Sequence, residues 1–237
     1  MHHDLVDMVD QTTTYGEMPE AKGDFALLVL NGVVHDTKLS RALMSAADFI
    51  VAVDAGYEHC LKLGVTPNLL MGDLDSIESQ PEGVPILEFD PAKNATDGEH
   101  AIHWLANHQF ARIILLGGLG PGRLDHVSYH LEALLGAARA GESMAITDGR
   151  LWVEAFVGPV ARQIYLADYF PADMVVSLMP RTAIKELVLD GLEWAIDRRD
   201  ITIPTSLTVS NQANPARNHF KLALREGELL LFLNTDS

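Results

Sequence analysis

The segment at residues 48–77, DFIVAVDAGYEHCLKLGVTPNLLMGDLDSI, decides the class of fold. It contains two short apolar runs, residues 48–54 and 68–76, on either side of an amphipathic stretch at residues 57–63. Continuous apolar runs of this length are typical of strands buried on both faces, and a helix between two such strands is typical of a parallel sheet. The segment therefore predicts a strand–helix–strand unit.

The same alternation of apolar runs and amphipathic stretches continues on both sides of this unit. Further apolar runs predict strands at residues 25–32, 85–89, 111–118 and 144–149, and helical periodicity predicts helices at residues 39–47, 97–108 and 125–140. We expect an N-terminal, three-layer, mostly parallel α/β (Rossmann-like) domain over residues 24–150.

After residue 150 the helical periods vanish and short β-like runs follow one another, separated by turn residues such as Asp190-Gly191. One of these runs, LTVSNQ, spans residues 207–212. The pattern predicts an antiparallel β-sandwich domain over residues 151–237. Residues 1–23 are polar, and we expect them to form a partly disordered extension outside the fold.

Composition limits the possible partners. The chain has 33 acidic and 17 basic residues, a formal charge of −16, which disfavours nucleic acid and anionic membrane surfaces. The single cysteine, Cys60, excludes an internal disulfide and a multi-cysteine zinc site. With no signal-peptide pattern at the start, we expect a cytoplasmic protein. An acidic protein that binds phosphates needs local neutralisation, for which a divalent cation held by carboxylates is suited.

Acidic residues follow three of the predicted strands or loops, at the edge of an α/β sheet where ligands bind. Asp54 ends the strand VAVD, where a helix cap is the alternative interpretation. Asp73 and Asp75 alternate after the strand NLLM, which favours a shared cation over a solvated turn containing Ser76. Asp97 lies inside a capping box formed by Thr96 and Glu99, so it can serve the helix, a ligand or both.

The fourth candidate segment is glycine-rich: LLGGLGPGRLDHVSYH at residues 115–130 joins a strand to a helix. Backbone N–H groups at a helix start can bind phosphate, and Arg123 adds a cation, although a plain tight turn also fits the glycines. The stretch is neither a Walker A motif nor a Rossmann fingerprint. The spacings His100/His103 and His126/His130 allow a zinc site, but no third ligand is evident.

Taken in order, the segments VDAGYEHCLKLGVTPNLLMGDLDSI, KNATDGEHA and GGLGPGRLDH resemble the thiamine pyrophosphokinase family. Its bacterial members carry an A-D-G-G run, G-D-x-D-S, K-D-x-T-D-x-E-x-A and G-x-x-G-G-R-x-D-H. The later segments GLEW and VSN are similar to the family's G-L-x-W/Y and S-N segments, so the resemblance covers about residues 25–234.

The resemblance implies a homodimer with shared active sites that transfers the diphosphoryl group of ATP to the thiamine hydroxyl and releases AMP. It implies Mg²⁺ on Asp73, Asp75 and Asp97. Arg123 and Asp125 complete the implied catalytic set. The implied nucleotide-binding residues are Asp54, Gly56, Ser76, Thr96, Gly118, Gly120, Gly122 and His126, and the implied thiamine-binding residues are Trp194, Ser210 and Asn211.

Three positions depart from the family pattern: Asn94 replaces an Asp, Ala55 replaces a Gly, and Pro121 lengthens the glycine loop. Two other functions therefore stay open. One is a diphosphokinase for another hydroxymethyl heterocycle, such as a pterin alcohol. The other is a non-catalytic sensor of thiamine or its phosphate, for which three metal-binding carboxylates have no use.

Overall fold

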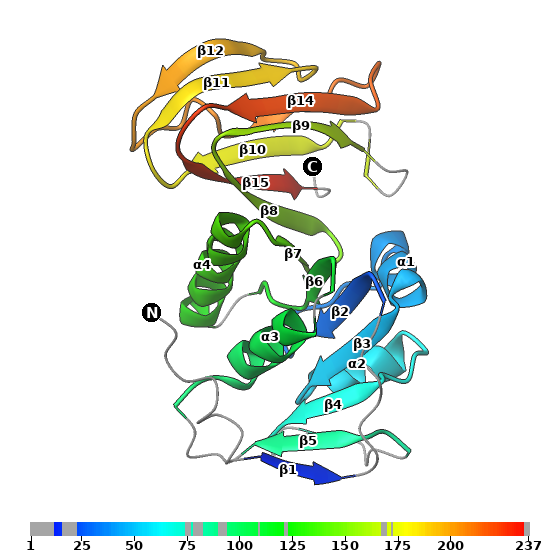
Figure 1. Cartoon of the computed structure of the whole chain (residues 1–237). Coiled ribbons are helices and arrows are strands. Elements are labelled where there is room, and N and C mark those ends of the chain that lie inside the picture. The colour runs from blue at the N-terminus through cyan, green and yellow to red at the C-terminus, as the bar shows by residue number, and fades with distance from the viewer. Residues whose placement is uncertain are drawn as a thin grey trace.

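The computed structural model describes residues 12–15, 23–73, 77, 83–89, 94–108, 110–120, 123–166, 170–171 and 173–234. Its first half is built on six parallel strands: β2 (Phe25–Val29), β3 (Phe49–Val53), β4 (Leu69–Gly72), β5 (Ile86–Phe89), β6 (Arg112–Leu116) and β7 (Ser143–Thr147). They lie side by side in the order β5-β4-β3-β2-β6-β7 (Figure 1). The prediction of a mostly parallel sheet is confirmed.

Four helices cover the two faces of this sheet: α1 (Lys38–Ala46), α2 (Gly56–Lys62), α3 (Asp97–Asn107) and α4 (Leu124–Ala140). Alternate residues of each strand point to opposite faces. Leu27 of β2 packs in one cluster with residues of α1 and α2, and Leu28 packs in the other with residues of α3 and α4. The result is the expected three-layer arrangement (Figure 1).

The second half consists of two antiparallel sheets packed face to face. Strands β8 (Leu151–Val157), β15 (Glu228–Asn234), β10 (Val175–Pro180) and β13 (Asn211–Gln212) form one sheet. Strands β12 (Ile196–Ile201), β11 (Ile184–Asp190), β14 (His219–Leu224) and β9 (Val160–Tyr165) form the other, in that order. Buried side chains from both sheets, among them Leu231 and Phe220, share one apolar cluster, as a sandwich requires.

The two halves are joined by hydrogen bonds as well as by the chain. Strand β8 pairs antiparallel with β7, so one eleven-stranded sheet runs from the α/β half into the sandwich. The division at residue 150 thus falls within a continuous sheet. None of the helices among the described residues is long and apolar enough to cross a membrane.

Three local expectations need correction. Strand β1 (Thr12–Tyr15), within the stretch that we placed outside the fold, pairs antiparallel with β5. Of the run LTVSNQ only Asn211–Gln212 is a strand. Strand β12 was missed because its sequence IDRRDI is mostly charged and exposed and lacks the apolar alternation of a half-buried strand.

The order of the parallel strands creates a switch point between β2 and β6. The chain leaves β2 toward α1 on one face of the sheet and leaves β6 toward α4 on the other. Loops that diverge in this way open a crevice at the carboxyl ends of the two strands, where ligands of α/β proteins bind.

Candidate functional site

A pocket of about 320 Å³ lies at this switch point. It is bounded by the carboxyl ends of β2, β3 and β6 and by the N-terminal ends of α3 and α4. Its walls are residues 30–32, 53–54, 96–98 and 117–120, with Arg123, His126, Val127 and His130 from the start of α4. The volume lies at the lower end of the range for small-molecule sites.

Many of the residues singled out in the sequence come together in this pocket. The structure places these predicted residues in its walls: Asp54, Thr96, Asp97, Gly118, Gly120, Arg123 and His126. Gly56, Asp73 and Asp125 are not among the lining residues. Asp75, Ser76 and Gly122, together with Pro121, lie outside the described residues.

The glycine loop after β6 presents backbone donors to the pocket. Gly117 has φ +83°, and a side chain there would place its Cβ 2.6 Å from the Leu30 carbonyl oxygen, so only glycine fits. Gly32 donates its N–H to the Gly117 carbonyl at 2.9 Å. No acceptor among the residues described bonds the N–H groups of Gly118, Leu119 or Gly120. Such donors can bind an anion.

Arg123 stands at the N-cap of α4 with its guanidinium held by two neighbours. Nε donates to Asp125 Oδ1 at 3.0 Å, and Nη2 donates to Asp125 Oδ2 at 2.9 Å and to His126 Nε2 at 2.6 Å. The hydrogen bond from Arg123 is the main cause that holds the pKa of the Asp125 carboxyl well below its usual range. Both side chains are exposed, so the pair orients the cation more than it stabilises the fold.

Two of the predicted carboxylates, Asp54 and Asp73, follow the neighbouring strands β3 and β4, and a third, Asp97, begins α3. Asp54 follows β3 with φ +49°, an uncommon conformation for a residue other than glycine. Its carboxylate lies against the backbone of Gly72, because a Cβ added there would come within 1.7 Å of Asp54 Oδ1. Asp73 is the next residue after β4, and Asp97 lines the same pocket as Asp54.

These residues fit a divalent cation by their chemistry, since carboxylate oxygens are the ligands that Mg²⁺ prefers. Across the part of the chain that the structure describes, no three His, Cys, Asp or Glu side chains converge in a metal-binding arrangement. The predicted triad of Asp73, Asp75 and Asp97 includes one residue outside that part.

Two predicted binding residues also have local structural partners. A Cβ on Gly56 would lie 2.1 Å from the Val29 carbonyl oxygen, so the missing side chain lets α2 approach β2. Thr96 is the N-cap of α3, and its hydroxyl accepts the Glu99 N–H at 3.2 Å. Burial is the largest cause that raises the pKa of Tyr129, and the nearby Glu99 carboxylate raises it further, to about 12.

The predicted thiamine-binding residues lie in the β-rich half and do not line the pocket. Trp194 lies between β11 and β12, and its side chain is 59% exposed. Asn211 is buried, and its amide bonds the backbone of Trp194: Oδ1 accepts the Trp194 N–H at 3.1 Å, and Nδ2 donates to the Trp194 carbonyl at 2.8 Å. Ser210 adopts φ +61° and donates its N–H to Ser177 Oγ at 2.9 Å.

Sequence reasoning missed two parts of the pocket. Asn31 and Gly32 follow β2, and their position after the strand FALLV was a usable signal because the other strand ends also supplied site residues. His130 was weighed only as half of a zinc pair with His126. In the structure His126 Nε2 accepts from Arg123 and His130 Nδ1 donates to the Gly118 carbonyl, so each ring has a different partner.

The fold and the pocket define a class: open α/β proteins with a ligand pocket at the switch point of a parallel sheet. The family described as "Thiamin pyrophosphokinase, catalytic domain" matches residues 40–146. The matched residues make up a little under half of this chain, and over them the chain is similar to this family.

Individual proteins are also similar to this chain. The thiamine pyrophosphokinase of Bacillus subtilis is 26% identical over 193 residues, which are 78% of this chain and 87% of that protein. The crystal structure of a thiamine pyrophosphokinase from Bacillus subtilis has the same fold, with a TM-score of 0.77 at 22% identity over 90% of this chain and 100% of that chain. Thiamin pyrophosphokinase from Candida albicans has a TM-score of 0.70 at 18% identity, with 90% and 89% covered.

Proposed function

We propose that the protein is a thiamine pyrophosphokinase that transfers the diphosphoryl group of ATP to the hydroxyl of thiamine, giving thiamine diphosphate and AMP. The observation that carries the proposal is the pocket at the switch point. There the glycine loop, Arg123 and the carboxylates of Asp54 and Asp97 face one space, in a chain that is similar to this family's catalytic domain.

The chain's own groups supply mainly binding and orientation, which suffice for most of the work in phosphoryl transfer. The loop N–H groups and the planar guanidinium of Arg123 bind phosphate oxygens, and Asp125 keeps that guanidinium in one orientation. Asp73, Asp75 and Asp97, with Asp54 nearby, would hold Mg²⁺. When bound, the ion neutralises phosphate charge and polarises a phosphoryl oxygen.

Product analysis tests the reaction. The purified chain is incubated with ATP, thiamine and Mg²⁺, and the nucleotides and thiamine phosphates are separated by chromatography. We expect AMP and thiamine diphosphate in equal amounts, and no product when EDTA removes the metal. ADP with thiamine monophosphate would refute diphosphoryl transfer. A parallel reaction with a hydroxymethyl pterin tests the other acceptor, and thiamine binding without turnover would identify a sensor.

We also propose that the active unit is a cytoplasmic homodimer with two shared sites. The described residues that line the pocket end at His130, whereas Trp194 lies in the sandwich, where Figure 1 shows β11 and β12 on the side away from the α/β half. A partner subunit can bring the two regions together across a two-fold interface. The cytoplasm supplies the proposed co-substrate ATP and keeps the single cysteine reduced.

Subunit complementation tests the shared site. Inactive Asp75→Asn chains are mixed with inactive Trp194→Ala chains under conditions in which subunits exchange. With random exchange half of the dimers are mixed, and one of the two sites in each mixed dimer carries neither change, so activity recovers to roughly a quarter of wild type. Verified exchange without recovery would place the whole site within one chain.

A further inference from the structure

His130 is a buried histidine in the wall of the pocket. It lies in the second turn of α4, and only 7% of its surface is exposed. Its Nδ1 is 2.8 Å from the carbonyl oxygen of Gly118. Because a carbonyl oxygen can only accept, Nδ1 carries a proton and donates it to this bond. Burial is the largest cause that lowers the pKa of His130, which favours the neutral ring.

The bond from His130 sets the direction of a loop peptide. In a planar trans peptide the C=O and N–H groups point in opposite directions. Fixing the Gly118 carbonyl on His130 therefore fixes the direction of the Leu119 N–H. The preceding peptide is fixed in the same way, since the Gly117 carbonyl accepts the Gly32 N–H at 2.9 Å and so orients the N–H of Gly118. Two successive loop donors are thus held by outside partners.

The ring and the loop also fit each other closely. A Cβ added to Gly118 would lie 2.6 Å from Ile146 Cδ1 and 3.4 Å from His130 Nδ1, so this position is filled by neighbouring side chains. The other side of the imidazole faces the start of α3, where a Cβ on Gly98 would lie 3.6 Å from Nε2. His130 therefore stands between the glycine loop and the first turn of α3.

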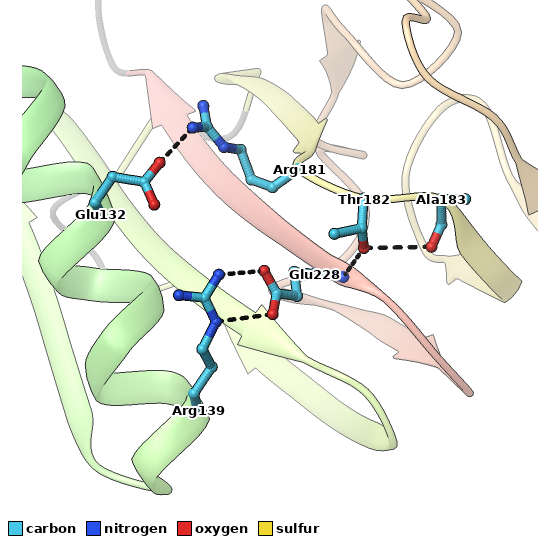
Figure 2. A network of polar contacts seen from close by, with 6 residues as sticks. All are labelled: Glu132, Arg139, Arg181, Thr182, Ala183 and Glu228. Carbon is cyan, nitrogen blue, oxygen red and sulfur yellow. Dashed lines mark hydrogen bonds and ion pairs between the residues drawn. The ribbon is translucent and has the colours of Figure 1, made fainter. Parts of the chain in front are cut away.

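The helix that carries His130 is anchored along its length. Next to His130, the Tyr129 hydroxyl lies near Glu99 in the first turn of α3. Near its end, Arg139 forms two hydrogen bonds, at 2.8 and 2.6 Å, with the carboxylate of Glu228 on β15 (Figure 2). Arg181, which follows β10, donates to Glu132 of α4 (Figure 2). The helix that presents the imidazole to the loop is thus tied to the β-rich half at two points beyond His130.

We propose that His130 is a positioning residue that presets the glycine loop for the triphosphate of the nucleotide. The proposal deepens the proposed function and rests on it. His130 acts through the Gly118 carbonyl and is not assigned a contact with the transferred group. An imidazole costs less to keep in place than a flexible side chain, because the ring has only two side-chain torsions to fix.

Three substitutions distinguish the contribution of the hydrogen bond from the contribution of the ring. The amide nitrogen of Asn stands the same number of bonds from Cβ as Nδ1, so His130→Asn can keep the donor to Gly118. The amide of Gln lies one bond further out, and His130→Phe keeps a ring without a donor. We expect the Phe and Gln variants to bind a non-hydrolysable ATP analogue roughly 3- to 10-fold more weakly, the loss expected for one neutral hydrogen bond. We expect the Asn variant to bind within about 3-fold of wild type.

Calorimetric titration with the analogue and Mg²⁺ measures binding without turnover, and steady-state kinetics should show a raised KM for ATP and an unchanged KM for thiamine. His103→Asn on the exposed side of α3 is the control. Wild-type affinity in both the Phe and Gln variants, or an Asn variant as weak as they are, would overturn the proposal. If the Phe variant does not fold, the proposal is tested by comparing the affinities of the Asn and Gln variants for the analogue. A wild-type chain that binds the analogue but makes no thiamine diphosphate would refute the proposed function and leave this comparison intact.

Discussion

Replacing Asn211 with alanine should destabilise the turn that carries Trp194. The Asn211 side chain makes three hydrogen bonds: to the N–H and the carbonyl of Trp194, and at 2.8 Å to the N–H of Gln212. At about 0.5–1.5 kcal/mol each, their loss costs roughly 1.5–4.5 kcal/mol. Trp194 is exposed, so water can replace part of what is lost. We therefore expect a cost of about 2 kcal/mol, which lowers Tm by about 4–8 °C in a chain of this size.

The assay is thermal and urea unfolding of the wild type and of Asn211→Ala, with Gln212→Ala as the matched control. Gln212 is exposed, and its side chain makes only a long contact, 3.4 Å from its amide nitrogen to the Asp173 carbonyl, so its replacement should change Tm little. The isosteric Asn211→Asp keeps Oδ1 but faces the Trp194 carbonyl with an oxygen, and should be at least as unstable as the alanine variant. Unchanged stability together with a raised KM for thiamine would refute this explanation and would indicate that Asn211 contacts thiamine directly.

Three further outcomes are expected. Asp73→Asn should lower kcat by at least ~100-fold with an unchanged unfolding midpoint, because it removes a charge and keeps the shape of the side chain. Normal turnover would show that the segment GDLDS is only a turn. Arg123→Lys should lower kcat/KM by roughly tenfold or more although the charge is kept, because an ammonium cannot reproduce the planar fork, and wild-type kinetics would contradict this. Burial raises the pKa of the Cys60 thiol to about 12, so a thiol reagent at pH 8 should label the chain only after unfolding; rapid labelling of the folded chain would show that the thiol is accessible.

Local patterns were enough to predict the six parallel strands and the four helices of the α/β half. The helix expected at residues 97–108 is α3, Asp97–Asn107, because Thr96 caps it and Ala101, Ile102 and Leu105 recur at helical spacing. Candidate site residues also followed from a general rule, since the carboxyl ends of parallel strands meet at one edge of the sheet. For that reason Asp54 and Gly118 could be assigned to one place although they are 64 positions apart.

The sequence by itself thus determined what depends on neighbours along the chain: the parallel strands, their helices, and the segments that reach the pocket. Only the tertiary structure decided what depends on pairing between distant segments. The union of β7 and β8 into one sheet needs backbone hydrogen bonds that carry no side-chain pattern. His130 and Asn211 are ordinary polar residues in the sequence. Their local partners are Gly118, 12 positions from His130 and bonded once, and Trp194, 17 positions from Asn211 and bonded twice. A directional bond of that kind is settled by how the chain packs and not by the spacing of its residue types.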